Sequence, residues 1–91
     1  MLWECTCRFC PEQYDIYRVS GIKVAYFRIR HGNLYVHPYK NEEIDFESTI
    51  YEKHYSDDRG WLEENEFNKI KRIVDFKIYC YLIRQWFKKI L

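Results

Sequence analysis

The sequence has 91 residues, of which 47% are hydrophobic and 20% aromatic, and its formal net charge is +1. This length predicts a single domain, 1–91, and excludes multidomain enzymes and repeat arrays. No apolar run reaches the roughly 18 residues that span a bilayer, and residues 1–13 have neither the basic flank nor the apolar stretch expected of a signal peptide. We therefore expect a cytoplasmic protein with no membrane partner.

Three cysteines lie close together in the N-terminal segment 1–13. Cys5, Cys7 and Cys10 form the pattern C-x-C-x-x-C, and a Cys-x-x-Cys pair is a common zinc-binding element. A structural zinc site needs a fourth ligand. The remaining candidates are His31, His37, His54 and Cys80. The alternative is that the thiols are small apolar groups in a reducing compartment. Zinc is thus one hypothesis, and no other cofactor is predicted.

The segment 14–55 has the alternation of an antiparallel sheet of three to four strands. Ser20-Gly21 and Gly32-Asn33 are turn dipeptides that divide 14–39 into three strands. These turns place Tyr17 opposite Val24 in the first hairpin. In the second hairpin they pair Arg30 with Tyr35, Arg28 with His37 and Tyr26 with Tyr39. The face predicted to enter the core comprises Tyr14, Ile16, Ala25, Phe27, Ile29, Val36 and Pro38.

The opposite face of this sheet interleaves cationic and aromatic side chains. It comprises Tyr26, Arg28, Arg30, Tyr35, His37 and Tyr39. Bases stack on aromatic rings and guanidinium groups pair with phosphate, so this face is a candidate nucleic-acid or nucleotide site. The alternative is an ordinary solvent-facing sheet surface, because cross-strand Arg and Tyr pairs also stabilise sheets.

The segment 41–66 is strongly acidic, with ten acidic and two basic residues. A fourth strand is expected within 44–55, where apolar residues alternate with acidic ones. One interpretation is an acidic surface for a basic protein partner. Its candidate residues are Glu42, Glu43, Asp45, Glu47, Asp57 and Asp58. The alternative is that these charges protect a sheet edge and complement a helix dipole.

The absence of proline from 58–91, and of glycine after Gly60, predicts one long C-terminal helix over 58–91, with 62–91 as its core. Its apolar stripe changes face near the middle, between Val74 and Phe76. Either the helix bends there and returns both faces to one core, or its second half packs on a partner. The second alternative predicts a homodimer. Its candidate interface is Tyr79, Ile83, Trp86, Phe87 and Ile90.

Catalytic signatures are absent from the sequence, since its three glycines form no phosphate loop and no serine lies in a nucleophile elbow. We therefore expect an α+β binding protein that is not an enzyme. The first hypothesis is a protein-binding inhibitor or adaptor whose target is a nucleic-acid-handling enzyme. A single alanine beside many Ile, Lys and Asn suggests a phage or mobile-element source, and so an anti-defence (anti-CRISPR-like) role in the host cytoplasm. The alternatives are a nucleic-acid or nucleotide binder and a small zinc module.

Overall fold

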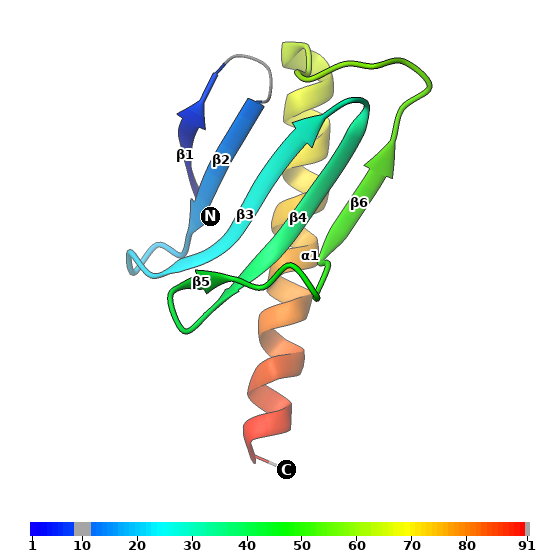
Figure 1. Cartoon of the computed structure of the whole chain (residues 1–91). Helices are drawn as coiled ribbons and strands as arrows, with labels where there is room; N and C mark the ends of the chain where they lie inside the picture. The colour runs from blue at the N-terminus through cyan, green and yellow to red at the C-terminus, as the bar shows by residue number, and fades with distance from the viewer. Residues whose placement is uncertain (9–11, 91) are drawn as a thin grey trace.

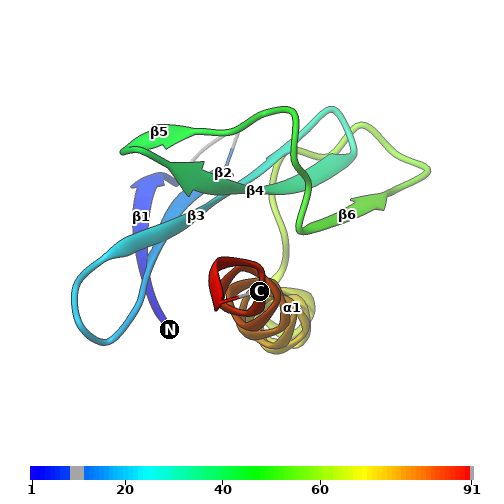
Figure 2. The same ribbon diagram turned by 90° about the horizontal axis from the view of Figure 1, so that it is seen from below.

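A computed structural model describes residues 1–8 and 12–90 of the chain. An antiparallel sheet forms one layer and a single long helix lies across one of its faces (Figures 1 and 2). The elements are β1 (Leu2–Cys7), β2 (Glu12–Tyr17), β3 (Lys23–Arg30), β4 (Asn33–Lys40), β5 (Glu43–Ile44), β6 (Tyr51–His54) and α1 (Glu64–Ile90). The predicted α+β class is confirmed, and the six strands of the sheet exceed the expected three to four.

The additional strands come from two segments. The N-terminal segment, expected only to carry cysteines, forms β1 and pairs with β2. The segment 44–55, expected to hold one strand, contributes the last residue of β5 and all of β6, and both strands pair with β4. A turn separates them because the Asp45 carboxylate accepts hydrogen bonds from the Glu47 amide, at 3.1 Å, and from the Ser48 hydroxyl, at 2.9 Å.

The first hairpin differs from its predicted register. Tyr17 lies opposite Lys23 instead of Val24, because the register shifts after the pair Ile16–Ala25. The cause is a wider turn, in which the Arg18 amide donates to the Ile22 carbonyl at 2.8 Å, so Val19 and Ile22 do not pair as strand residues. The shift allows two consecutive residues, Val24 and Ala25, to be buried.

The second hairpin turns at His31-Gly32 and not at Gly32-Asn33. Both turn residues have positive φ, 52° and 75°, as a two-residue hairpin turn of this type requires. The pairs are therefore Arg30–Asn33, Arg28–Tyr35 and Tyr26–His37, which corrects the three predicted pairs. Because the register moves by two residues, each side chain still lies on its predicted face.

The core lies between the sheet and α1. The predicted core face is confirmed: Ile16, Ala25, Phe27, Ile29, Val36 and Pro38 are buried, and Tyr14 is half-buried at its edge. Phe27 lies in an aromatic cluster, with ring centroids 5.3 Å from Trp3, 5.7 Å from Tyr14 and 6.4 Å from Phe67. Trp3 also donates its indole N–H to Asp75 at 2.8 Å, which fastens β1 to α1.

The helix α1 is one uninterrupted element of 27 residues, so the alternative with a bend near residue 76 does not occur. It packs on the sheet through Ile70, Val74 and Ile78, and Leu82 is its last residue that packs against the core. Beyond that point the helix extends past the end of the sheet (Figure 1). No helix among the described residues is long and apolar enough to cross a membrane.

Glu66 links the start of α1 to β6 and gives a testable pH dependence. Its carboxylate accepts hydrogen bonds from Tyr55, at 2.8 Å, and from Lys53, at 3.3 Å. These bonds, that of Tyr55 foremost, hold the pKa of Glu66 below its ordinary value of 4.5. A carboxylate whose pKa is lowered by folding stabilises the folded state above its unfolded pKa, and this contribution is lost as the pH falls.

We expect Glu66→Gln to lower the free energy of unfolding at about pH 7, and its difference from the wild type to shrink below about pH 4.5, where the wild-type carboxyl is also neutral. Urea denaturation at a series of pH values measures this. A difference that stays constant down to about pH 3 would show that the charge on Glu66 is not responsible.

Candidate functional site

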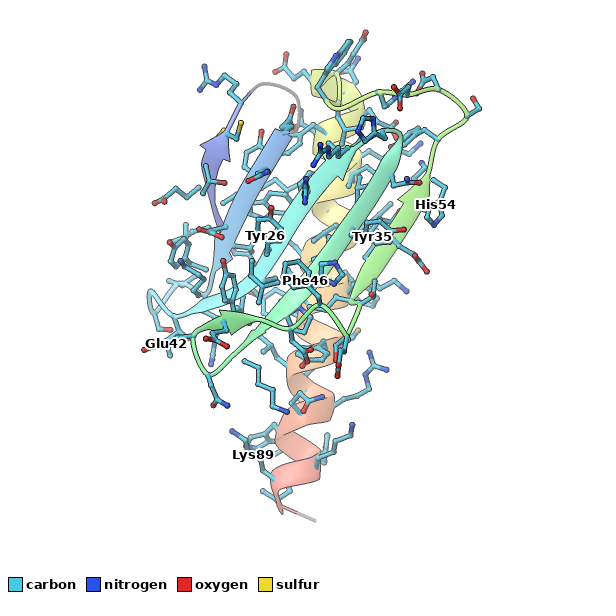
Figure 3. The ribbon with its side chains drawn as sticks, in the orientation of Figure 1. Tyr26, Tyr35, Glu42, Phe46, His54 and Lys89 are labelled. Atoms are coloured by element: carbon cyan, nitrogen blue, oxygen red, sulfur yellow. The ribbon has the colours of Figure 1, made fainter. Side chains whose placement is uncertain are left out.

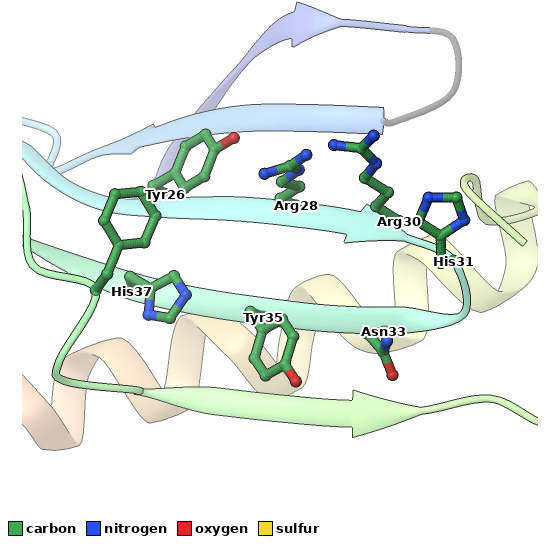
Figure 4. A pocket seen from close by; sticks show the side chains of 8 residues that line it. Tyr26, Arg28, Arg30, His31, Asn33, Tyr35 and His37 are labelled. Carbon is green, nitrogen blue, oxygen red and sulfur yellow. The ribbon is translucent and has the colours of Figure 1, made fainter.

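The face of the sheet turned away from α1 carries a depression of about 430 Å³ (Figures 3 and 4). Two adjacent strands form its floor: β3 supplies Tyr26, Arg28 and Arg30, and β4 supplies their cross-strand neighbours. We call this depression the outer-face pocket. Its lining residues are Tyr26, Arg28, Arg30, His31, Asn33, Tyr35, His37 and Phe46. It thus combines five of the six residues predicted for this face.

The sixth predicted residue, Tyr39, lies further along β4 and is used differently. Its hydroxyl donates to Asp15 at 2.7 Å, and burial, followed by this hydrogen bond, raises its pKa well above the usual range. Lys23 pairs with the other carboxylate oxygen of Asp15 at 3.4 Å. This end of the face is therefore electrically balanced and internally hydrogen-bonded.

Arg28 and Arg30, in contrast, have no acidic partner among the residues that the structure describes. The Nε–H of Arg28 is also buried without a hydrogen-bond acceptor in this part of the chain. Of the nearby carboxylates, Asp15 is already paired with Lys23. The other two lie beside histidines, Glu52 at 3.3 Å from His54 and Asp58 at 3.1 Å from His31. The pocket therefore presents two uncompensated guanidinium groups on one strand.

The other end of the pocket is aromatic. The His37 ring is stacked on Tyr35, with centroids 5.8 Å apart, and meets Phe46 edge to face at 5.2 Å. His37 Nδ1 lies 2.8 Å from the Ser48 carbonyl oxygen, which only accepts, so Nδ1 carries the proton and Nε2 of the neutral ring is an acceptor. Burial raises the pKa of Tyr26, which keeps its hydroxyl protonated.

Sequence reasoning missed three residues of this pocket: His31, Asn33 and Phe46. The predicted Gly32-Asn33 turn put Asn33 in the turn itself and His31 on the core side of the sheet, opposite Leu34. The alternation in 44–55 grouped Phe46 with Ile44 and Ile50, but the turn after β5 leaves Phe46 exposed over the outer face (Figure 3). The signal available in the sequence was Asp45, whose side chain favours a turn at this point.

The six acidic candidates do not form one surface. Glu42 lies in the β4–β5 connection and Glu43 begins β5, and Asp45 and Glu47 follow in the turn after β5. Asp57 and Asp58 belong to the β6–α1 connection at the other end of the sheet (Figures 1 and 3). Two of them lie against basic side chains. Asp57 pairs with Arg59 at 2.8 Å and Asp58 with His31 at 3.1 Å. Acidic residues that belong to one stretch of the sequence therefore lie at opposite ends of the sheet.

The five residues predicted for a homodimer interface are all exposed on α1. With Phe76 they form a stripe, and their exposed fractions lie between 48% and 65%. We call this stripe the helix seam; its members are Phe76, Tyr79, Ile83, Trp86, Phe87 and Ile90. Ile83 is nine residues from the buried Val74, a rotation of about 180° around the helix axis, so the seam lies opposite the core.

The cysteine pattern is only partly described. Cys10 lies outside the described residues, and a register shift between Cys5 and Cys7 places Cys5 opposite Tyr14 and Cys7 opposite Gln13. Because cross-strand partners point to the same side, Cys5 and Cys7 belong to opposite faces of β1. Within the described ranges no three His, Cys, Asp or Glu side chains are grouped as a metal site. The zinc hypothesis stays a prediction.

In comparisons with protein-family models, with curated proteins and with solved structures, no match to this chain is found. The outer-face pocket and the helix seam are therefore the two candidate sites of this chain.

Proposed function

We propose that this chain is a small protein-binding module, of the inhibitor or adaptor kind, that associates through the helix seam, and that the partner of the seam is a second copy of the chain. The observation that carries this proposal is a row of large apolar side chains left in solvent on the side of α1 opposite the core. Exposed apolar patches of this kind mark protein interfaces. The proposed activity is binding and not catalysis.

The spacing of the seam supports a helix as the partner. Its main residues, Phe76, Tyr79, Ile83, Trp86 and Ile90, are separated by three, four, three and four residues. This is the 3.5-residue repeat with which two helices pack side chains into each other, and β-branched residues such as Ile83 and Ile90 at the first heptad position are typical of two-stranded pairs. The seam thus fits a copy of itself.

The size of the seam also suits a dimer. Because each aromatic side chain offers about 150–250 Å² of surface, the exposed parts of the six side chains amount to about 600 Å² per chain. Two copies would then bury about 1,200 Å², the lower end of specific protein interfaces. The seam lies on the side of α1 opposite the core, so two copies can pack seam to seam about a two-fold axis with both sheets on the outside. Such a contact uses the same patch on both chains and gives a closed dimer.

Ile83→Glu tests this proposal. A carboxylate at the centre of a packed seam would be desolvated without a partner, so we expect the variant to be a monomer where the wild type is a dimer, with at least tenfold weaker association. Sedimentation equilibrium over a range of concentrations measures both.

Ile22→Glu is the matched control. Ile22 lies in the β2–β3 connection and is 58% exposed, against 54% for Ile83, so its substitution changes the same residue type at similar exposure outside the helix seam. This control should remain dimeric. A wild type that is monomeric at high concentration, or a dimer that survives Ile83→Glu, would refute the homodimer.

A further inference from the structure

We propose that the outer-face pocket binds single-stranded nucleic acid, with a base at its aromatic end and backbone phosphates on Arg28 and Arg30. This site is on the opposite side of the molecule from the helix seam and does not depend on the proposed association. The ligand class follows from the two ends of the pocket, which present different chemistry along the same pair of strands (Figure 4).

The cationic end fits a phosphate backbone. Arg28 and Arg30 are two positions apart on β3, so their side chains leave the same face about 6.7 Å apart along the strand. Neither has an acidic partner among the described residues, whereas Lys23, Lys53 and Arg59 each have one. A guanidinium presents paired N–H donors that match phosphate oxygens, so these two residues would hold the backbone of the ligand.

The aromatic end fits a base. Phe46 is 65% exposed, and it stands beside His37 at the rim of the pocket, where an unstacked base can lie against it. Because the Ser48 carbonyl fixes the proton of neutral His37 on Nδ1, Nε2 is an acceptor for an amino group of a base. Tyr35 continues this aromatic row along β4 toward the cationic end.

The shape of the site favours a strand over a duplex or an enclosed small molecule. The depression is open along the sheet, and its lining follows β3 and β4 from Tyr26 to the His31 turn. A base within a duplex is stacked on its neighbours and does not offer a free face, whereas a single strand offers one base face and adjacent phosphates together. This arrangement supports binding with little preference for base sequence, through stacking of bases on aromatic rings and contacts of phosphates with arginines.

Fluorescence anisotropy with labelled single-stranded DNA and RNA of about ten nucleotides tests the proposal. We expect binding that weakens with salt, and at least tenfold weaker binding for the double variant Arg28→Ala/Arg30→Ala. Loss of two phosphate contacts should also reduce the slope of log K against log salt by about 1.4, since each contact contributes about 0.7. Phe46→Ala should weaken binding by about tenfold through lost stacking.

Lys77→Ala/Arg84→Ala is the matched control, because it removes the same charge from exposed positions of α1. This control should bind single-stranded nucleic acid as tightly as the wild type does. Ile83→Glu should also leave the affinity per chain unchanged. Circular dichroism verifies that each variant is folded. The proposal is overturned if no single strand binds at low salt, if the helix double variant weakens binding as much as the sheet double variant, or if a duplex of the same length binds equally well.

Discussion

Phe27→Ala is expected to remove about 3–5 kcal/mol from the free energy of unfolding, the usual effect of truncating a buried phenylalanine. Phe27 is fully buried, and its ring contacts those of Trp3, Tyr14 and Phe67, which belong to β1, β2 and α1. The cavity would therefore open where these three elements meet β3. Since a domain of this size is stable by only about 5–14 kcal/mol, much of the total stability would be lost.

Urea denaturation at a single protein concentration measures this effect, because any association adds a concentration-dependent contribution to stability. Phe46→Ala is the control, since Phe46 is the same residue type at 65% exposure and lies outside the core. It should change the free energy of unfolding by less than about 0.5 kcal/mol. Equal losses in the two variants would mean that the aromatic cluster around Phe27 does not hold the sheet to the helix.

The core side of the fold was predictable from alternation. Buried residues recur with period two between turn residues, as Ala25, Phe27 and Ile29 do on β3, and burial of one sheet face under a helix determines which side they take. The error in the second turn did not disturb this assignment because it moved the register by two residues. A shift of one residue would have moved the core residues to the solvent face. Because that exposure costs much free energy, the side on which each residue lies can be predicted from the sequence.

Other elements gave weaker signals. The strand β1 has polar residues at Glu4 and Thr6 and lies at the edge of the sheet, so only Trp3 shows that it packs on the core. The strands β5 and β6 are short, and a side-chain hydrogen bond from Asp45 decides where the first of them ends. Such local polar contacts leave no periodic pattern, so a sequence window does not reveal them.

The two candidate sites were predictable to different degrees. The members of the helix seam follow from the helical period alone, because residues such as Ile83 and Trp86 stay on one side of any uninterrupted helix. The outer-face pocket needs tertiary structure, since Phe46 reaches it only through the turn between β5 and β6. Whether Arg28 and Arg30 have acidic partners likewise depends on how distant carboxylates pair. A sequence predicts which residue types share a face, but the pairing of charges is a property of the packed chain.

Gly32→Ala is the second substitution expected to have a large effect. Gly32 has φ of 75°, which costs a residue with a side chain about 1–2 kcal/mol, and its amide and carbonyl bond to Arg59 and Tyr55 at 2.7 and 2.8 Å. A methyl group at this position would collide with the Asp57 carbonyl oxygen. The β6–α1 connection would therefore have to move away from the β3–β4 turn, and the free energy of unfolding should fall by clearly more than the backbone cost alone.

Gly21→Ala separates the two causes of that loss. Gly21 also has positive φ, 94°, but apart from its chain neighbours no described residue has an atom within 4 Å of the position that a methyl group would take. Its substitution should therefore cost only the conformational part, about 1–2 kcal/mol. Amide hydrogen exchange at position 32 and at Tyr55 should accelerate in Gly32→Ala and remain unchanged in Gly21→Ala, because only the first breaks the contact between the turn and the connection. Equal destabilisation by the two substitutions would show that this contact does not constrain the turn. In that case the cationic end of the outer-face pocket, which the same turn carries, would not depend on the β6–α1 connection for its position.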